Sequence, residues 1–254
     1  MIANSHTGKL ILIGCGPGAA DLLTVRAAKR IAEADLVLYD RLIEPEVLEF
    51  ASNDAERLYV GKAPGDGGVQ QAALNEKIAE AVAAGLRVAR LKSGDPMVFG
   101  RASEEIAAAI AAGGEVEIVP GVTAALAAAA GSAISVTERA ELQSFVVTTG
   151  RAADKDAPPD WASLMKPGVC AAFYMGVGQA WRIQSTLMAS GVPGHAPADW
   201  IERAGCYDSR TVSTTLERVA HAADAENVRN PAVLLVRFPK SLAADKAAAA
   251  AQAR

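Results

Sequence analysis

Short apolar runs alternate with longer, alanine-rich amphipathic stretches along the first half of the chain. Each run has the length of a strand, and each intervening stretch has the length and period of a helix. Strands that alternate with helices favour parallel pairing, because each helix returns the chain to the end of the sheet where the next strand begins. We expect strands at KLILI (9–13), DLVLY (35–39), RLYV (57–60), LRVARL (86–91) and VEIV (116–119).

A second series of apolar runs follows an alanine-rich segment, VTAALAAAAGSA (122–133), which has the composition of a closely packed helix. Helices are expected near 179–190 and 216–223, and the polar, proline-bearing stretch 151–161 is expected to be an exposed loop. The strands expected in this half are SFVVTTG (144–150), VCAAFYMG (169–176), ADWIERAG (198–205), TVSTTL (211–216) and AVLLVRF (232–238).

These patterns predict an α/β protein of two domains. The N-terminal domain, residues 9–121, has a mostly parallel sheet, and the C-terminal domain, residues 122–240, has a mixed sheet. The alanine-rich tail, 241–254, is expected to be flexible. Within the printed sequence we expect no further fused domain.

Composition narrows the class of protein. With 254 residues, 51% hydrophobic and 21% charged, the chain reads as globular, and its net charge of -4 argues against a nucleic-acid partner. No apolar run approaches the roughly 18 residues of a membrane span, and the N-terminus lacks the apolar centre of a secretion signal, so we expect a cytoplasmic protein without a membrane partner. Three well-separated cysteines indicate neither disulfides nor a structural metal.

Glycine and polar residues gather where the expected strands of the first half end. In open α/β sheets this edge is where ligands bind, because successive loops converge there. Each cluster by itself also has the composition of an ordinary turn. The clusters are Gly14–Gly18, Asp40–Arg41, Gly61–Lys62, Ser93–Pro96 and Pro120–Thr123.

The first cluster, GCGPG, invites a dinucleotide-binding interpretation, which Asp40 strengthens by its distance along the chain. Pro17 weakens it, because proline removes an amide donor from a loop that has to cradle phosphate. Thr24 is a good N-cap, which places the helix start several residues past the glycines. The loop therefore favours a ligand without phosphates, with a nicotinamide-dependent oxidoreductase as an alternative.

Three of the polar positions suit chemistry as well as turns. Asp40 and Arg41 form either a surface ion pair or an acid/base pair at the sheet edge, and Lys62 is either a solvated lysine or a group that binds carboxylates or exchanges a proton. In GRASEE (100–105), the two glutamates are assigned to the start of a helix.

Taken together, six motifs resemble those of the S-adenosylmethionine-dependent tetrapyrrole methyltransferases in order and spacing: GCGPG, LVLYDRL, YVGK, RLKSGDPMVFGR, VPGVTAA and FYMG. The resemblance runs from about Lys9 to Pro239. It implies a homodimer of two-domain α/β subunits that hold S-adenosylmethionine in a cleft between the domains, with S-adenosylhomocysteine as product and no metal.

The resemblance also implies roles for individual residues. Asp40 matches the position of a proton acceptor and Lys62 that of a proton donor, while Arg41 and Arg101 match arginines that face the substrate. The positions that would bind the methyl donor are Pro17, Ser93, Gly94, Asp95, Val98, Thr123, Ala124, Met175 and Gly205.

The implied reaction is methylation of carbons 2 and 7 of uroporphyrinogen III, giving precorrin-2 for sirohaem or cobalamin biosynthesis. Two segments depart from the family pattern: Ser93-Gly94 stands where two glycines are usual, and Thr137–Ala140 (TERA) stands where Thr-His-Arg-Asp is usual. These departures leave open a different precorrin methyltransferase and, from another class, a non-catalytic binding module.

Overall fold

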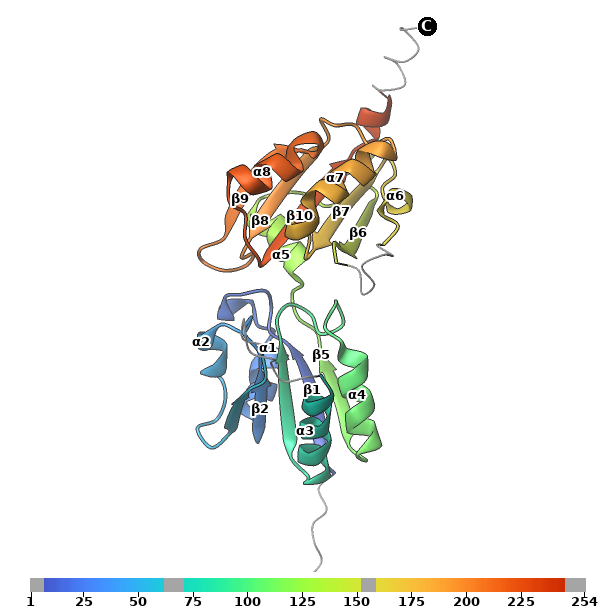
Figure 1. Ribbon diagram of the computed structural model, residues 1–254. Helices are drawn as coiled ribbons and strands as arrows, with labels where there is room; N and C mark the ends of the chain where they lie inside the picture. The colour runs from blue at the N-terminus through green and yellow to red at the C-terminus, as the bar shows by residue number, and fades with distance from the viewer. Residues whose placement is uncertain (1–6, 62–70, 152–158, 245–254) are drawn as a thin grey trace, which may run out of the picture. The chain divides into compact units, whose positions relative to one another are not determined.

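The computed structural model describes residues 7–61, 71–151 and 159–244 (Figure 1). The chain divides into two compact units, with the division between Ala124 and Ala125. We call them unit 1 and unit 2. Each is built on one five-stranded sheet, so the predicted α/β class is confirmed.

The sheet of unit 1 is entirely parallel in its pairings. Its strand order is β3-β2-β4-β1-β5, so β1 and β4 lie in the interior and are buried on both faces. This confirms the parallel sheet that the alternation of strands and helices predicted. The strands are β1 (Lys9–Gly14), β2 (Leu36–Tyr39), β3 (Glu56–Tyr59), β4 (Arg87–Lys92) and β5 (Glu115–Val119).

Helices cover both faces of this sheet (Figure 1). Helices α1 and α2 pack with the face that carries Ile13 and Leu91, whereas α3 and α4 pack with the face that carries Leu12. Thr24 caps α1 as predicted, because its hydroxyl accepts a hydrogen bond from the Ala27 N–H at 3.1 Å. The helical elements are η1 (Ala20–Leu22), α1 (Val25–Ala32), α2 (Pro45–Leu48), α3 (Gln71–Ala83) and α4 (Ala102–Ala111).

The sheet of unit 2 is mixed, as predicted. Strands β6 and β7 are parallel, and the pairings β7-β10, β10-β8 and β8-β9 are antiparallel. The strand order is β6-β7-β10-β8-β9. The strands are β6 (Ser144–Thr149), β7 (Val169–Tyr174), β8 (Pro197–Glu202), β9 (Arg210–Thr215) and β10 (Ala232–Phe238).

Helices α6, α7 and α8 bury one face of this sheet around Phe173 and Trp200. Helix α5 is joined to the end of β7, because the Ala125 N–H donates to the Tyr174 hydroxyl at 2.8 Å. The helical elements are α5 (Ala124–Gly131), α6 (Trp161–Leu164), η2 (Val177–Gln179), α7 (Ala180–Ala189), η3 (Leu216–Arg218) and α8 (Val219–Ala225).

The predicted exposed loop 151–161 is wrong at its last residue. Trp161 is 1% exposed and begins α6. Its ring packs edge-on against Phe173 with centroids 6.0 Å apart, and its indole N–H donates to the Thr149 carbonyl at 3.1 Å. A large apolar ring with a satisfied N–H is stable in the core whatever the polarity of the preceding residues. Residues 152–158 lie outside the described ranges.

The predicted flexible tail begins as a helix. Residues 240–244 are helical, and both the backbone N–H and the hydroxyl of Ser241 donate to the Glu141 carboxylate, at 3.0 and 2.8 Å. The rest of the tail, 245–254, lies outside the described residues. Within the ranges that are described, no helix is long and apolar enough to cross a membrane.

Candidate active site

Three glycine-bearing loops meet at the carboxyl ends of β1, β4 and β5. Gly16 and Gly94 exchange backbone hydrogen bonds of 3.3 and 2.7 Å, which joins the first loop to the second. A Cβ added at Gly14 would lie 2.5 Å from the Gly121 nitrogen and 2.8 Å from the Gly94 oxygen, so the third loop also lies against the other two. Three of the five strand-end clusters that the sequence singled out, Gly14–Gly18, Ser93–Pro96 and Pro120–Thr123, are therefore neighbours in unit 1.

Asp95 joins the β4 loop to the β5 loop. One carboxylate oxygen accepts from the Met97 N–H at 2.8 Å, and the other accepts from the Gly121 N–H at 3.1 Å. Val98 belongs to the same turn, because its N–H donates to the Asp95 carbonyl at 3.1 Å. The structure thus assigns Asp95 a role in holding the loops, and its contact with the methyl donor stays a prediction.

Further residues predicted to bind the donor lie beside this junction. Gly94 has φ +72°, and a Cβ there would meet the Ala124 nitrogen at 3.7 Å and the Thr123 Cα at 3.8 Å. The left-handed backbone at this position favours glycine. Ser93, which replaces the usual first glycine, is half-buried. Pro17 is half-buried in the β1 loop.

Asp40 projects from the end of β2 with a side chain that is 29% exposed. One carboxylate oxygen accepts from the Leu42 N–H at 3.1 Å, and the other accepts from Nη2 of Arg90 at 3.2 Å. Arg41, the next residue, is exposed. Lys62, the predicted proton donor, lies outside the described residues.

Arg101 is exposed at the start of α4, with a left-handed backbone at φ 53°. Its guanidinium donates to both carboxylate oxygens of Glu104, at 2.7 and 2.8 Å. These hydrogen bonds lower the pKa of the Glu104 carboxyl. Arg101 is therefore an exposed cation whose direction is fixed by the neighbouring turn of its own helix.

A buried ionic cluster behind Asp40 was missed by the sequence analysis. Arg90, Lys92 and Glu105 are 6%, 5% and 1% exposed. Both oxygens of Glu105 accept from Nζ of Lys92 at 2.8 Å, and Oε1 also accepts from Nε of Arg90 at 3.4 Å. Burial, together with the nearby Arg90 charge, lowers the pKa of the Lys92 ammonium.

One signal in the sequence pointed to this cluster. Arg90 and Lys92 alternate along an otherwise apolar interior strand, so they project from the same face and need a buried anion. Glu105 lies in the first turn of α4, as assigned, but its carboxylate is buried against Lys92, whereas Glu104 is the exposed member of the pair.

The two predicted donor-binding residues of unit 2 both have left-handed backbones. Met175 directly follows β7, is 44% exposed and has φ 54°. Gly205 has φ 80° in the segment between β8 and β9. Residues with such backbones occur at sharp turns, and a non-glycine residue there marks a position worth testing for function.

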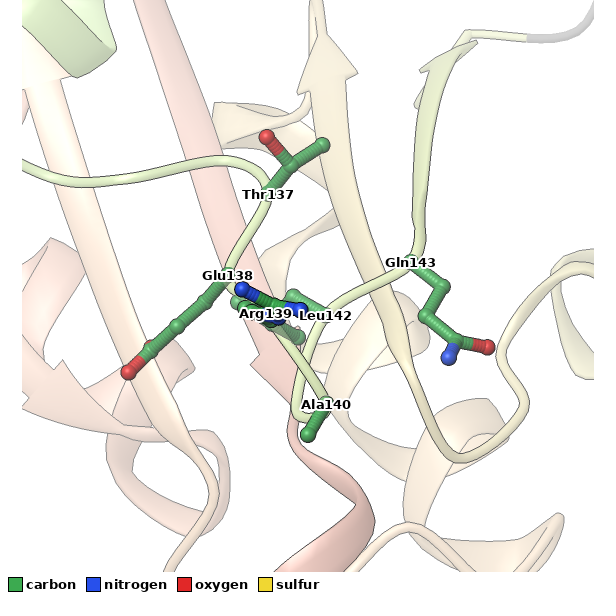
Figure 2. A pocket seen from close by; sticks show the side chains of 6 residues that line it. All are labelled: Thr137, Glu138, Arg139, Ala140, Leu142 and Gln143. Carbon is green, nitrogen blue, oxygen red and sulfur yellow. The ribbon is translucent and has the colours of Figure 1, made fainter.

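The segment that departs from the family pattern lines an open pocket of about 390 Å³ in unit 2. A tight turn forms it, because Glu138 and Leu142 exchange two backbone hydrogen bonds of 2.8 Å. Figure 2 shows that the side chains of Glu138 and Gln143 extend away from the two sides of this turn. The lining residues are Thr137, Glu138, Arg139, Ala140, Leu142 and Gln143.

Nucleophilic thiol chemistry does not fit the buried cysteines. Burial raises the pKa of the Cys15 thiol to about 12, and it raises that of Cys170 to about 12 as well. A thiol with such a pKa is protonated near neutral pH, and the thiolate is the nucleophile. Among the described residues, no group of three or more His, Cys, Asp or Glu side chains is arranged to hold a metal ion.

The meeting point of the loops fits a ligand without phosphate groups. The N–H groups of Gly16 and Gly94 bind each other's carbonyls, and the Gly121 N–H binds Asp95. The Cys15 N–H donates to the Lys92 carbonyl at 2.9 Å, and Pro17 has no N–H. A phosphate site at a glycine loop needs such donors unoccupied. This weakens the dinucleotide interpretation and suits a sulfonium compound such as S-adenosylmethionine.

The profile of the tetrapyrrole (corrin/porphyrin) methylases matches residues 9–220. The chain belongs to the tetrapyrrole methylases. The matched range contains the five strands of unit 1 and extends through β9 of unit 2, so membership in this family rests on both units.

Among curated tetrapyrrole methylases, siroheme synthase 1 of Klebsiella pneumoniae is 42% identical over 231 residues, which are 91% of this chain and 49% of that protein. A siroheme synthase of Pseudomonas paraeruginosa is 40% identical over 92% of this chain and 50% of its own length. The chain thus spans about half the length of the curated relatives it matches.

Solved structures of the family cover the chain almost completely. Uroporphyrin-III C-methyl transferase of Thermus thermophilus, crystallised with S-adenosylhomocysteine, is 34% identical with a TM-score of 0.77, over 91% of this chain and 92% of that one. A cobalt precorrin-4 methyltransferase from cobalamin biosynthesis is 26% identical with a TM-score of 0.82, over 94% and 98%.

Proposed function

We propose that this tetrapyrrole methylase transfers methyl groups from S-adenosylmethionine to carbons 2 and 7 of uroporphyrinogen III, giving precorrin-2 for sirohaem or cobalamin biosynthesis. The likeness to the Thermus thermophilus uroporphyrin-III C-methyl transferase supports the proposal most directly, because the two chains match over nearly their whole length. The motifs YDRL, VGK and GDPMVFGR, which resemble those of the same branch of the family, add to it.

The methyl donor would be held at the junction of the β1, β4 and β5 loops in unit 1. Pro17, Ser93 and Gly94, with Val98, are the residues assigned to it there, next to Thr123 and Ala124. Asp95 would fix the shape of this surface through Met97 and Gly121. When bound, S-adenosylmethionine supplies an electrophilic methyl group on a positively charged sulfur. Met175 and Gly205 are also proposed to bind the methyl donor, on the basis of the sequence motifs.

Asp40 is the residue proposed to take up the proton that leaves the macrocycle after a pyrrole carbon has been methylated. Its carboxylate is partly exposed at the sheet edge, and both oxygens are oriented by hydrogen bonds. An oriented carboxylate is an effective general base when the proton lies within hydrogen-bond reach. Lys62 is proposed as the matching proton donor from sequence alone.

Arg41 and Arg101 are proposed to bind the carboxylates of the substrate. Both are exposed cations near the carboxyl ends of strands in unit 1. Uroporphyrinogen carries eight carboxylates, and a guanidinium binds a carboxylate through two parallel hydrogen bonds. Local positive charge of this kind attracts an anionic substrate even though the whole chain has a net charge of -4.

The proposal is tested by incubating the purified protein with uroporphyrinogen III and S-adenosylmethionine without oxygen. Mass spectrometry should find a product heavier by two methyl groups, together with S-adenosylhomocysteine. An unchanged porphyrinogen mass, with the substrate still reduced at the end of the incubation, rejects the substrate assignment.

A different precorrin methyltransferase is the second candidate. The TM-score of 0.82 with the cobalt precorrin-4 methyltransferase favours it, as does the altered segment around the Thr137–Ala140 turn. Assays with later methylated precorrins distinguish the two, since the second candidate predicts methylation of such a compound and none of uroporphyrinogen III.

The family resemblance also leads us to propose a homodimer that works in the cytoplasm. Sedimentation velocity at several protein concentrations tests the first point, with a species of twice the 26.2 kDa chain mass expected. Fractionation of cells that produce the protein tests the second.

A further inference from the structure

We propose that Glu105 is a positioning residue that keeps the Asp40 carboxylate at the surface of unit 1 by occupying the two buried cations behind it. The inference rests on the proposed function for the role of Asp40, and it concerns how the protein presents that carboxylate.

The geometry is a chain of four side chains that leads from the core to the sheet edge. Lys92 binds both oxygens of Glu105 at 2.8 Å, Glu105 binds Nε of Arg90 at 3.4 Å, and Nη2 of Arg90 binds Asp40 at 3.2 Å. Exposure rises from Glu105 outward: the side chain of Glu105 is 1% exposed, that of Arg90 is 7% and that of Asp40 is 29%. The side chain of Lys92, on the inner side of Glu105, is 7% exposed.

Charge is balanced within the described part of this cluster, since two cations face two anions. A buried cation without an anion is strongly unfavourable, so Lys92 and Arg90 each require a carboxylate. Glu105 accepts two hydrogen bonds from the Lys92 ammonium and one from Arg90. Arg90 also donates Nη1–H to the Leu91 carbonyl at 2.6 Å. Asp40 therefore makes only one hydrogen bond to the buried cations, the bond from Nη2 of Arg90.

This leaves the second Asp40 oxygen outside the ionic cluster. It accepts the Leu42 N–H at 3.1 Å, which fixes the carboxylate across the turn that follows β2. Without Glu105, Asp40 would be the remaining described anion for both cations. Electrostatic attraction would then draw its carboxylate inward, away from Leu42 and from any substrate at the sheet edge.

Glu105→Gln tests the proposal because it removes the charge and keeps the shape. We expect turnover to fall about 10- to 100-fold, the cost of displacing a reacting group by around an ångström, while S-adenosylhomocysteine affinity changes less than about twofold. We also expect the Leu42 amide, followed by NMR without any substrate, to exchange with solvent at least about tenfold faster, because it loses its acceptor.

A double variant, Lys92→Met with Glu105→Gln, distinguishes an effect of unbalanced buried charge from an effect of lost packing. It leaves Arg90 and Asp40 as a balanced pair, so we expect slower Leu42 exchange and higher turnover than in Glu105→Gln alone. If Glu105 only supports the fold, removing a second partner makes the double variant no better than the single one. The same comparison tests the proposal if Glu105→Gln is poorly folded. Only the balance of charge explains a double variant that folds better than Glu105→Gln and protects the Leu42 amide better.

Glu117→Gln is the matched control. Glu117 also bridges two cations in unit 1, Lys9 at 2.7 Å and Arg30 at 2.8 Å, and it lies on the edge strand β5. The Glu117→Gln variant should exchange the Leu42 amide and turn over substrate at the rates of the parent protein. Leu42 exchange within twofold of the parent in Glu105→Gln would overturn the proposal. Because that measurement needs no substrate, it stands even if uroporphyrinogen III is not methylated.

Discussion

The carboxylate of Asp95 accepts a hydrogen bond from the Gly121 N–H at 3.1 Å, across 26 positions of the chain. This contact ties the turn that follows β4 to the turn that follows β5. The residue predicted to touch the methyl donor therefore also determines whether the surface for that donor exists at all.

Replacing Asp95 by Asn should weaken donor binding by at least about tenfold and destabilise the fold by about 1–3 kcal/mol, because an amide has one acceptor oxygen for two backbone N–H groups. Isothermal titration with S-adenosylhomocysteine and urea unfolding measure the two effects. Asp54→Asn, in an exposed turn, is the control and should change neither. Unaltered donor affinity in a folded Asp95→Asn protein would contradict the predicted site.

Asp40→Asn should lower turnover by about 10²- to 10⁴-fold while donor affinity stays within about twofold, because a general base acts on the substrate proton and not on donor binding. Steady-state kinetics with S-adenosylhomocysteine titration measures this split. Asp35→Asn is a matched control, since Asp35 adjoins the opposite end of β2 and also pairs with an arginine of β4. A parallel loss of donor affinity in Asp40→Asn argues against the assignment.

Gly121→Ala should prevent the three loops from closing. The added Cβ would lie 2.2 Å from the Gly94 oxygen and 2.7 Å from the Gly14 carbonyl carbon, distances at which backbone has to shift. We expect a loss of about 3 kcal/mol in the free energy of unfolding, and no measurable donor binding. Gly131→Ala, where an added Cβ meets no atom within 4 Å, is the control and should retain donor binding and stability.

The Asp35–Arg87 pair should contribute stability that is lost in acid. Two side-chain hydrogen bonds from Arg87 hold the pKa of the Asp35 carboxyl below its ordinary value of 3.8. A carboxyl with a lowered folded pKa stabilises the fold above the unfolded value, and this contribution disappears as pH falls through the folded value.

The measurement is the free energy of unfolding of the parent and of Asp35→Asn between pH 7 and pH 3. Above about pH 5 the parent should be more stable by about 0.5–1 kcal/mol, a modest value because both side chains are more than a third exposed. The difference should narrow below about pH 4. A difference that grows in acid would show that the sign of the linkage is wrong.

The fold was predictable because its signals are local. Interior strands such as β1 and β4 are continuous apolar runs, and their alternation with helices fixes parallel pairing. Trp161 was missed because polar and proline residues precede it, whereas its burial depends on a partner, Phe173, that lies elsewhere in the sequence. No local pattern encodes that contact.

The candidate site also has a part that local sequence predicts and a part that depends on tertiary contacts. Glycine and acidic residues at strand ends are visible in sequence, and parallel strands place their ends on one edge. The role of Glu105 was not visible, because adjacent residues on a helix point about 100° apart, so Glu104 can face solvent while Glu105 faces Lys92. Which of the two turns inward depends on the rotation of α4 against the sheet, a tertiary property.

The crowding of Gly14, Gly94 and Gly121 bears on how this enzyme family can diversify. Backbone spacing at these three strand ends leaves no room for even a methyl group at Gly14 or Gly121. Evolution or design toward another tetrapyrrole therefore has to work through side chains that project from a fixed frame, such as Arg41, Met97 and Arg101. Substitutions in the loop backbone itself would shift the frame, so we expect changes of substrate specificity to fall on these surrounding side chains.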